Sequence, residues 1–321
     1  MGTGGCIVQL ERFEYILAII EEQSFTRAAK RLFISQPTLT QYVNKLEAEL
    51  GVRLFHRSKS PVTLTEAGVY YLNSMRRIYV EEQRLYNQMQ YFQETRKVFR
   101  IGMSTLRAKM WLPLILPEFS RNHPEVSIQC THSGDSTLEE IVQQGKVDVA
   151  LGALNPGYHG LSYACFPKET LHWILPRNCD FLNHAQLDNN SPQNPLLIPA
   201  GILEQIPLLL PEPEYGFYQS AQTMLEKHGI AKIFPAVICS NPETNYQMAA
   251  AGMGATLTNG IVLDTLYPNL REKVIFATLT NPPATRIGRV AWRPDTVNDA
   301  LVQDFVQTAV NALEQAYPNG T

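Results

Sequence analysis

The sequence predicts an α/β protein made of a helical N-terminal module and a larger C-terminal body of alternating strands and helices. Its 321 residues suggest about two domains, at ~150 residues each. Apolar residues recur with helical spacing up to about residue 97, and from Val98 short apolar strands alternate with helical segments. The composition, 45% hydrophobic and 18% charged, excludes a disordered or collagen-like chain. No apolar run approaches the ~18 residues of a membrane span, so we expect no membrane partner.

The charge is distributed unevenly along the chain. Residues 1–97 carry 13 Lys+Arg against 10 Asp+Glu, net +3, whereas the remainder is net -6. Residues 23–60 alone are net +5. A basic module joined to an acidic body predicts a polyanionic partner for the module only.

Two helices open the module. The first has one apolar face, formed by residues at helical spacing: Leu10, Phe13, Ile16, Leu17 and Ile20. Ser24 and Thr26 can each cap the second helix, which contains Arg27 and Arg31. The adjacent alanines 28 and 29 allow another helix to approach closely.

A third helix is expected after Ser35, a good N-cap residue, with Pro37 in the first turn, where a missing N–H costs little. Gly51 ends this helix. Its buried side carries four leucine or valine residues spaced 4, 3 and 4 apart: Leu39, Val43, Leu46 and Leu50. The opposite side is polar and carries Pro37, Gln41 and Asn44, flanked by Thr38, Thr40 and Lys45.

The second and third helices, joined by a turn of three to four residues, form a helix-turn-helix. Its polar side suits a major groove, because Gln and Asn pair bidentately with adenine and Thr offers a hydroxyl or a methyl group. The surrounding basic residues would neutralise phosphates: Arg27, Arg31, Lys45, Arg53, Arg57 and Lys59. From composition alone, an ordinary helical hairpin with a solvated face is an equal alternative.

A basic wing and a long helix complete the module. Short strands expected at 52–55 and 62–64 flank a polar turn at 57–60. Thr65 then caps a helix from Glu66 to about residue 93. Apolar side chains recur along it near heptad spacing, with Glu82 breaking the seam: Leu72, Met75, Tyr79, Tyr86 and Met89. The helix either packs on its own domain or pairs with a helix of another subunit.

A gap-free pattern of about 60 residues in this region resembles the N-terminal module of LysR-type transcriptional regulators. The pattern is Ser24-Phe25-Thr26-x-Ala28-Ala29-x-x-Leu32-x-Ile34-Ser35-Gln36-Pro37-x-Leu39-Thr40-x-x-Val43-x-x-Leu46-Glu47-x-x-Leu50-Gly51-x-x-Leu54-Phe55-x-Arg57, ending in Leu64-Thr65-Glu66-Ala67-Gly68. This sequence has Thr40 where the family usually has a serine, so the side-chain hydroxyl is kept. The resemblance implies a winged helix-turn-helix DNA-binding domain over residues 6–64. We expect these DNA-binding residues: Ser24, Thr26, Arg27, Arg31, Ser35, Gln36, Pro37, Thr38, Thr40, Gln41, Lys45, Arg53, Arg57 and Lys59.

The resemblance also implies partners. Residues 65–95 become a linker helix through which two subunits dimerise, and tetramers are common in the family. A dimer would place two recognition helices on successive turns of double-stranded DNA, which predicts an interrupted inverted repeat. RNA polymerase is a further expected partner. The five scattered cysteines, none in a C-x-x-C, argue for a reducing, cytoplasmic location and against a disulfide framework or zinc site.

The body, residues 96–316, is predicted to fold as two α/β lobes. Strands at 98–103, 126–130 and 147–151 alternate with a helix over 105–122, despite Pro113 and Pro117, and with one starting at the Ser136–Glu139 capping box. Strands at 171–175, 208–210, 236–239 and 255–258 indicate a second unit. Lobe I spans about 96–165 and 270–316, and lobe II about 166–269. Two lobes joined by crossing strands resemble the effector domain of the same family and periplasmic binding proteins.

A ligand would bind between such lobes, where strand ends and helix N-termini converge. Ser104 and Thr105 open a helix whose free N–H groups favour an anion, and Arg107 could complete that site. We therefore expect a carboxylate or other small anion as effector. Further candidates end the second strand or lie across the cleft: Ser133, Gly134, Tyr218, Asn241 and Thr258. Ser104, Asn241 and Thr258 each have a local alternative role, which is to cap a helix or to end a strand.

An enzyme is the rival class of function. Gly252-x-Gly254 lacks the third glycine of a dinucleotide fingerprint, and no Walker loop, H-E-x-x-H or G-x-S-x-G occurs. The seven histidines show no ligand spacing. We therefore expect no catalysis, metal or cofactor. The other alternative, a ligand-independent architectural DNA-binding protein, would leave roughly 220 residues of body with no role except oligomerisation.

Overall fold

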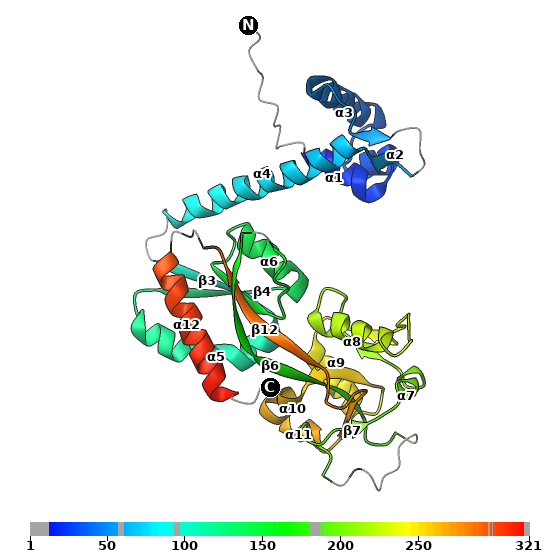
Figure 1. Ribbon diagram of the computed structural model, residues 1–321, viewed down its shortest axis with the longest axis vertical. Coiled ribbons are helices and arrows are strands. Elements are labelled where there is room, and N and C mark those ends of the chain that lie inside the picture. Colours follow the sequence, from blue (N-terminus) through cyan, green and yellow to red (C-terminus); the bar gives the residue numbers. More distant parts are fainter. Residues whose placement is uncertain are drawn as a thin grey trace. The chain divides into compact units, whose positions relative to one another are not determined.

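The computed structural model (Figure 1) describes residues 13–56, 61–92, 97–158, 160–179, 187, 189–294, 296 and 298–317. The chain divides into two compact units, Met1–Tyr86 and Asn87–Thr321. Within the described ranges, no helix is both long and apolar enough to cross a bilayer.

The first unit is a helix-turn-helix with a short hairpin and a long helix. Its elements are α1 (Phe13–Glu22), α2 (Phe25–Arg31), α3 (Gln36–Leu50), β1 (Phe55–His56), β2 (Thr63–Leu64) and α4 (Glu66–Tyr91). The predicted caps are confirmed, since Ser24 and Ser35 accept hydrogen bonds from the N–H groups of Arg27 and Thr38. The wing strands are shorter than expected, at two residues each. The wing tip, residues 57–60, lies outside the described residues.

A buried carboxylate ties the third helix to the wing. Glu47 is only 4% exposed, on the side of α3 that the sequence assigned to apolar residues alone. Its Oε1 accepts hydrogen bonds from the N–H groups of Leu54, at 2.7 Å, and Phe55, at 3.2 Å. Its Oε2 lies 2.9 Å from Nη1 of Arg53. Three donors therefore compensate the burial of this charge.

The heptad pattern along α4 mixes two faces. Leu72 and Met75 are buried in the core of the first unit, and the ring of Tyr79 lies 6.0 Å from that of Phe13. The expectation that these residues form an intersubunit seam was therefore wrong, because they pack on their own domain. The last two residues of the predicted seam, Tyr86 and Met89, are exposed. Met89 also lies in a row with Ile78 and Leu85, which are exposed as well.

The second unit is built on one large mixed sheet. Its strands follow the order β4-β3-β5-β12-β6-β11-β7, and β10 also pairs with β6. The strands are β3 (Val98–Met103), β4 (Ser127–His132), β5 (Val149–Gly152), β6 (Ser162–Pro176), β7 (Leu196–Leu197), β10 (Thr256–Asn259), β11 (Val274–Thr278) and β12 (Thr285–Trp292). A separate pair joins β8 (Leu209–Leu210) to β9 (Val237–Ile238). The helices are α5 (Thr105–Asn122), α6 (Asp135–Gln143), α7 (Gly201–Glu204), α8 (Gly216–Glu226), α9 (Pro242–Ala250), α10 (Gly260–Leu266), α11 (Pro268–Arg271) and α12 (Asp299–Ala316).

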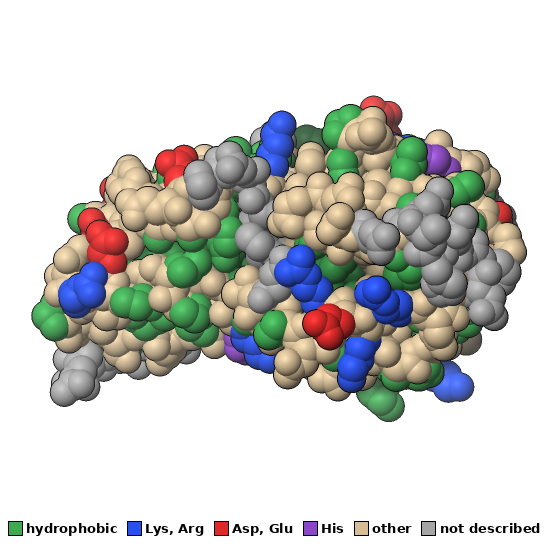
Figure 2. Space-filling view, turned by 90° about the horizontal axis from the view of Figure 1, so that it is seen from below, with side chains coloured by type: hydrophobic (Ala, Val, Ile, Leu, Met, Phe, Trp, Pro, Cys, Tyr) green, Lys and Arg blue, Asp and Glu red, His purple; other side chains and the backbone are tan. Residues whose placement is uncertain are grey.

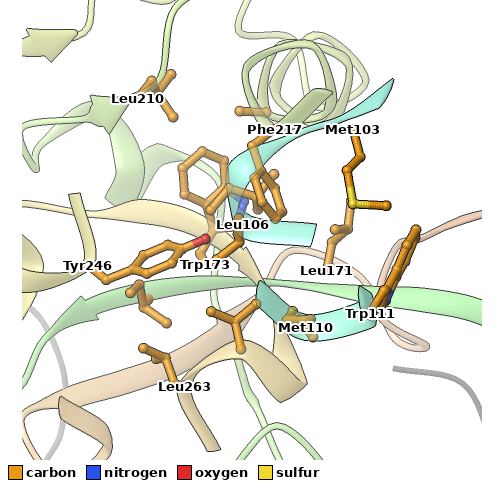
Figure 3. Packing of buried hydrophobic residues seen from close by; sticks show 14 of the residues in the cluster. Met103, Leu106, Met110, Trp111, Leu171, Trp173, Leu210, Phe217, Tyr246 and Leu263 are labelled. Carbon is orange, nitrogen blue, oxygen red and sulfur yellow. The ribbon is translucent and has the colours of Figure 1, made fainter. Parts of the chain in front are cut away.

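Two long strands connect the lobes. β6 and β12 run antiparallel, and β6 then continues to pair with β10 and β11 (Figure 1). The predicted crossing strands are confirmed, although β6 has 15 residues where the sequence predicted a short strand. One hydrophobic core extends through both lobes, and it joins Met103 and Trp111 to Trp173, Phe217 and Tyr246 (Figure 3).

Three local expectations changed in the body. Helix α6 begins at Asp135 after an N-cap Gly134, not at a Ser136–Glu139 capping box, because Glu139 instead accepts a hydrogen bond from the Asn155 N–H at 2.7 Å. Helix α5 continues through Pro113 and Pro117, which lie on its exposed side. β4 is an edge strand on which Cys130 is exposed rather than half-buried.

Packing explains why α5 is not broken by its prolines. The ring of Phe119 lies 5.2 Å from those of both Phe99 on β3 and Phe305 on α12. Trp111 and Ile115 are buried on the same side of the helix. Tertiary burial of one face outweighs the two missing backbone hydrogen bonds.

Candidate functional site

The polar side of α3 is open to solvent. The side chains of Ser35, Gln36, Pro37, Thr38 and Gln41 are exposed, and that of Thr40 is partly buried. Local hydrogen bonds order this surface, from Gln36 Nε2 to Thr40 Oγ1 at 2.8 Å and between the Ser35 and Thr38 hydroxyls at 2.7 Å. Among the described residues the Gln41 amide has no partner, which leaves it available to a base edge.

The basic residues expected to contact phosphates are paired with carboxylates. Arg31 Nη1 lies 2.5 Å from Glu21 Oε2, Lys45 Nζ lies 3.9 Å from Glu49 Oε1, and Arg53 pairs with Glu47. Arg27 pairs in the same way with Glu22, at 3.5 Å. The pairs of Arg27, Arg31 and Lys45 are exposed and worth less than ~1 kcal/mol each, so a phosphate can replace the carboxylate there. Arg53 differs, because its partner Glu47 is buried.

The remaining DNA-binding candidates have different surroundings. The Ser24 hydroxyl is engaged as the N-cap of α2, and Thr26 is exposed in the first turn of that helix. Arg57 and Lys59 fall outside the described residues. Figure 2 shows the molecule from below the view of Figure 1, and on that face of the protein acidic and basic side chains lie interspersed with apolar ones.

A cavity of about 250 Å³ lies between the lobes of the second unit. The N-terminal turns of three helices line it, namely Ser104–Arg107 at α5, Tyr215–Phe217 at α8 and Ser240–Pro242 at α9. Asp135, Asn259 and Arg286 complete its wall. Helix N-termini carry a partial positive charge, so their convergence favours a negatively charged ligand. Two of the N–H groups at these helix starts are already used, since Gly216 donates to Asp135 and Glu243 to Asn241.

Four of the eight predicted effector residues line this cavity: Ser104, Thr105, Arg107 and Asn241. Ser104 is the N-cap of α5, yet its hydroxyl makes no capping hydrogen bond. Asn241 does act as a cap, because its Oδ1 accepts a hydrogen bond from the Glu243 N–H at 3.0 Å.

The other four predicted residues lie away from the lining. Ser133 exchanges a hydrogen bond with the Thr137 hydroxyl, and a Cβ at Gly134 would lie 3.0 Å from the Glu214 carbonyl oxygen. Thr258 is fully buried and donates its hydroxyl proton to the Asn259 carbonyl. Tyr218 is partly buried on α8. Their contact with an effector stays a prediction.

A buried ionic cluster forms the inner wall of the cavity. Arg107 Nη1 lies 2.6 Å from Asp135 Oδ1, and Arg107 Nη2 lies 3.2 Å from Glu169 Oε2. Arg286 Nε donates to the same oxygen of Glu169. Burial opposes ionisation of the two carboxyls, but the two guanidinium groups prevail and lower the pKa of Asp135 and of Glu169. The Arg107 charge is therefore already balanced within the protein.

Arg286 also lines the cavity and is not among the residues predicted from the sequence. Its side chain is 11% exposed, and its Cζ lies 4.1 Å from the centre of the Phe217 ring. Its Nη1 is buried and has no hydrogen-bond partner among the residues that the structure describes. The expected strand began at Gly288, and extending the alternation two residues earlier would have placed Arg286 on a crossing strand.

Two contacts hold the lobes together beside the cavity. Asp135 Oδ2 accepts a hydrogen bond from the Gly216 N–H at 3.1 Å, which joins α6 to α8. Lys109 Nζ on α5 lies 2.6 and 2.7 Å from the two carboxylate oxygens of Glu243 on α9. Charge-assisted hydrogen bonds thus connect the two lobes at two places.

Comparisons with known proteins match both units. The model of the bacterial regulatory helix-turn-helix protein, lysR family, matches residues 10–69, and the LysR substrate binding domain matches residues 92–314. An uncharacterised HTH-type transcriptional regulator, YcgK of Bacillus subtilis, is 27% identical over 98% of this chain and 97% of its own. The HTH-type transcriptional regulator BenM of Acinetobacter baylyi is 29% identical over 46% of this chain and 48% of its own.

Solved structures show the same fold. Full-length BenM has a TM-score of 0.53 at 21% identity, covering 97% of each chain. Full-length CbnR complexed with its target DNA has a TM-score of 0.51 at 20% identity, covering 95% of this chain and all of that one. At these identities the likeness speaks for the fold alone.

Proposed function

As a member of the LysR family, the chain is a DNA-binding transcriptional regulator with an effector-binding domain, and we propose that a small organic acid bound between its lobes sets its activity on DNA. The observation that carries this proposal is that Arg286 lines the cavity and that its buried Nη1 has no hydrogen-bond partner among the described residues. A buried guanidinium N–H without an acceptor costs free energy, and a carboxylate oxygen of a ligand would supply that acceptor.

The rest of the cavity fits the same ligand class. The Ser104 hydroxyl and the N-terminal turn of α5 offer further donors to a carboxylate. Leu106, Met110 and Phe217 present apolar surface to the body of the ligand. A volume of about 250 Å³ limits that body to a small one, such as a short aliphatic chain or a single ring.

The proposed contact set differs from the sequence expectation at one residue. Arg286 replaces Arg107 as the cationic contact, because both Asp135 and Glu169 already pair with Arg107. Ser104, Thr105 and Asn241 keep their proposed roles. Ser133, Gly134, Tyr218 and Thr258 would reach an effector only after a movement of the lobes.

The test is calorimetric titration of the full chain with a panel of small carboxylates, matched amines and sugars. A carboxylate should bind, and at 100 times its dissociation constant it should add about 2.7 kcal/mol to the free energy of unfolding. Arg286→Gln should weaken binding at least about tenfold, the loss of one charge-assisted hydrogen bond. Arg177→Gln, at an exposed arginine that directly follows β6, is the matched control and should bind normally. Preferential binding of an amine or sugar, or full affinity in Arg286→Gln, would refute the proposal.

We propose further that the N-terminal end of α3 enters the major groove and that Gln41 contacts a base there. Recognition helices of this class read bases with their first turns. The exposed, unpartnered Gln41 amide supports this placement. The phosphate contacts proposed for Arg27, Arg31, Lys45 and Arg53 follow from the same orientation, and Arg57 and Lys59 would extend them along the wing.

The exposed row on α4 supports dimerisation. Ile78, Leu85 and Met89 are spaced 7 and 4 residues apart, and each is at least 39% exposed. Such spacing suits a helix of a second copy. The dimer would bind an interrupted inverted repeat, act in the cytoplasm, and contact RNA polymerase at its promoters.

A further inference from the structure

Phe33 has a large apolar side chain that is not packed in the hydrophobic core. It lies in the turn between α2 and α3, and it is 97% exposed. A ring that removes no surface from water contributes no hydrophobic stabilisation. Its neighbour Ile34, by contrast, is partly buried against the core of the unit.

The backbone at Phe33 also disfavours this residue type. Its φ is +56°, in the left-handed region. Two hydrogen bonds close the end of α2, from Ile34 N to Ala29 O at 3.1 Å and from Phe33 N to Lys30 O at 3.2 Å. This is a Schellman motif whose left-handed position is normally Gly or Asn, because a Cβ is strained there. Glycine would serve the fold better, so neither the ring nor the conformation is explained by stability.

The position of Phe33 points to DNA. It precedes the N-cap Ser35 of α3 by two residues, and the exposed polar side of α3 follows directly. Lys30 and Arg31 beside it are exposed and basic, as a surface near phosphates requires. Among base edges in the major groove, the C5-methyl group of thymine is the apolar feature that an aromatic ring can contact.

We propose that Phe33 packs against the C5-methyl group of a thymine at the edge of the groove that α3 enters. This inference rests on the proposed placement of α3. The contact would bury the ring on binding and add a thymine preference outside the bases that Gln41 and its neighbours reach.

The test uses a duplex selected by the parent protein from a randomised pool, in which each thymine is replaced singly by deoxyuridine. Deoxyuridine pairs identically but lacks the methyl group. At one thymine in each half-site, the parent should lose about threefold to tenfold in affinity, the effect of burying a methyl group. Phe33→Ala should lose a similar factor on the thymine duplex and show no further loss on the deoxyuridine duplex.

Two further variants separate DNA contact from folding. Phe33→Gly should raise the unfolding temperature, because glycine relieves the left-handed strain, while its DNA affinity falls as in Phe33→Ala. Phe234→Ala, at another exposed phenylalanine in the second unit, should leave DNA affinity unchanged.

The failures are distinguishable. If Phe33→Ala binds like the parent, or is weakened equally on every thymine and deoxyuridine duplex, the methyl contact is refuted. If Gln41→Ala relaxes base preference in the same assay, the placement of α3 survives that failure. If Gln41→Ala keeps the parent preference, the placement itself is wrong.

Discussion

The ionic cluster at the cavity couples stability to the ligand site through single side chains. Asp135 and Glu169 are nearly inaccessible, and each depends on Arg107 for a compensating charge. Arg286 compensates only Glu169 by a direct bond and keeps one N–H group free. The two arginines of the cluster therefore differ: Arg107 is paired on two sides within the protein, and Arg286 is the one that the proposed function assigns to a ligand.

Arg107→Gln should lower the free energy of unfolding by about 3–5 kcal/mol, because removing one partner leaves a buried carboxylate uncompensated. Urea denaturation of the full chain measures the change, and Arg177→Gln should stay within about 0.5 kcal/mol of the parent. A loss below about 1 kcal/mol in Arg107→Gln would show that the cluster relaxes or admits water.

His172 gives the second unit an acid sensitivity. It is 1% exposed on β6, and burial lowers its pKa to about 4. The unfolded chain takes up this proton near pH 6.5, so it binds more protons than the folded chain between pH 6.5 and 4. Stability is thus full above pH 6.5 and should fall by about 3 kcal/mol toward pH 4. His172→Gln should flatten this slope in denaturation series across that window, and an unchanged slope would contradict the assignment.

Among the residues that line the cavity, the sequence predicted those that can be recognised from their neighbours in the chain. Ser104, Thr105 and Asn241 were found because each stands at a strand-to-helix junction. Arg286, Asp135 and Glu169 come together from β12, α6 and β6, and no spacing along the chain brings them into one pattern. The ion pairs of Arg107 were not predictable for the same reason, since its partners are 28 and 62 residues away along the chain.

Among the elements, α4 shows how one helix can serve two faces. Its first half buries Leu72 and Met75 in its own domain, and its exposed row begins at Ile78. Heptad spacing alone does not separate these faces, because both are apolar. The distinction depends on the packing of α1 against α4, as in the contact of Phe13 with Tyr79.

Leu85→Glu should convert the protein to monomers and weaken its binding to an inverted-repeat duplex more than to a half-site, since charge in an apolar seam is repelled. Light scattering and DNA titration measure the two effects. Asn73→Glu, exposed on another side of α4, is the control and should remain oligomeric. Leu72→Glu should instead unfold the first unit. A dimeric Leu85→Glu protein would place the subunit contact elsewhere.

An ion pair between helices α5 and α9 leads to a second prediction about secondary-structure elements. The Lys109–Glu243 bridge joins them beside the cavity, with Lys109 48% and Glu243 12% exposed. Such a pair contributes less than ~1 kcal/mol to stability, so its effect should appear in the kinetics of ligand exchange.

Lys109→Glu should speed both association and dissociation of the carboxylate found by titration, because like charges separate the helices at the cavity edge. The charge-swapped double variant, with Glu243→Lys added, should restore the parent rates. Stopped-flow binding measures them. If the rate changes of the two single variants simply add in the double variant, the Lys109–Glu243 bridge does not control access to the cavity.

For the whole molecule, the order of elements was predictable and the extent of several was not. Strand–helix alternation and the crossing strands follow from periodicity, and β3 and α5 match their predicted bounds. Strand β6 is longer than predicted. Its first half alternates only weakly in hydrophobicity, and pairing with the distant strand β12 sets its length. Among the described residues of the wing, β1 and β2 pair at two positions, Phe55 with Leu64 and His56 with Thr63.

At this scale the proposed function requires that ligand binding change an equilibrium between forms of the assembled regulator. An effector shifts that equilibrium only by the difference in its affinity for the two forms.

Ser104→Trp would fill much of a cavity of about 250 Å³, so effector binding should be lost. Its DNA affinity without effector should stay near that of the parent, because Ser104 belongs to the second unit and the DNA-reading helix to the first. Ser120→Trp, exposed on the same helix α5, is the control and should respond normally. The measurement is the footprint on the selected duplex with and without the carboxylate found by titration. A Ser104→Trp protein whose footprint still changed on addition of that carboxylate would place the effector outside this cavity.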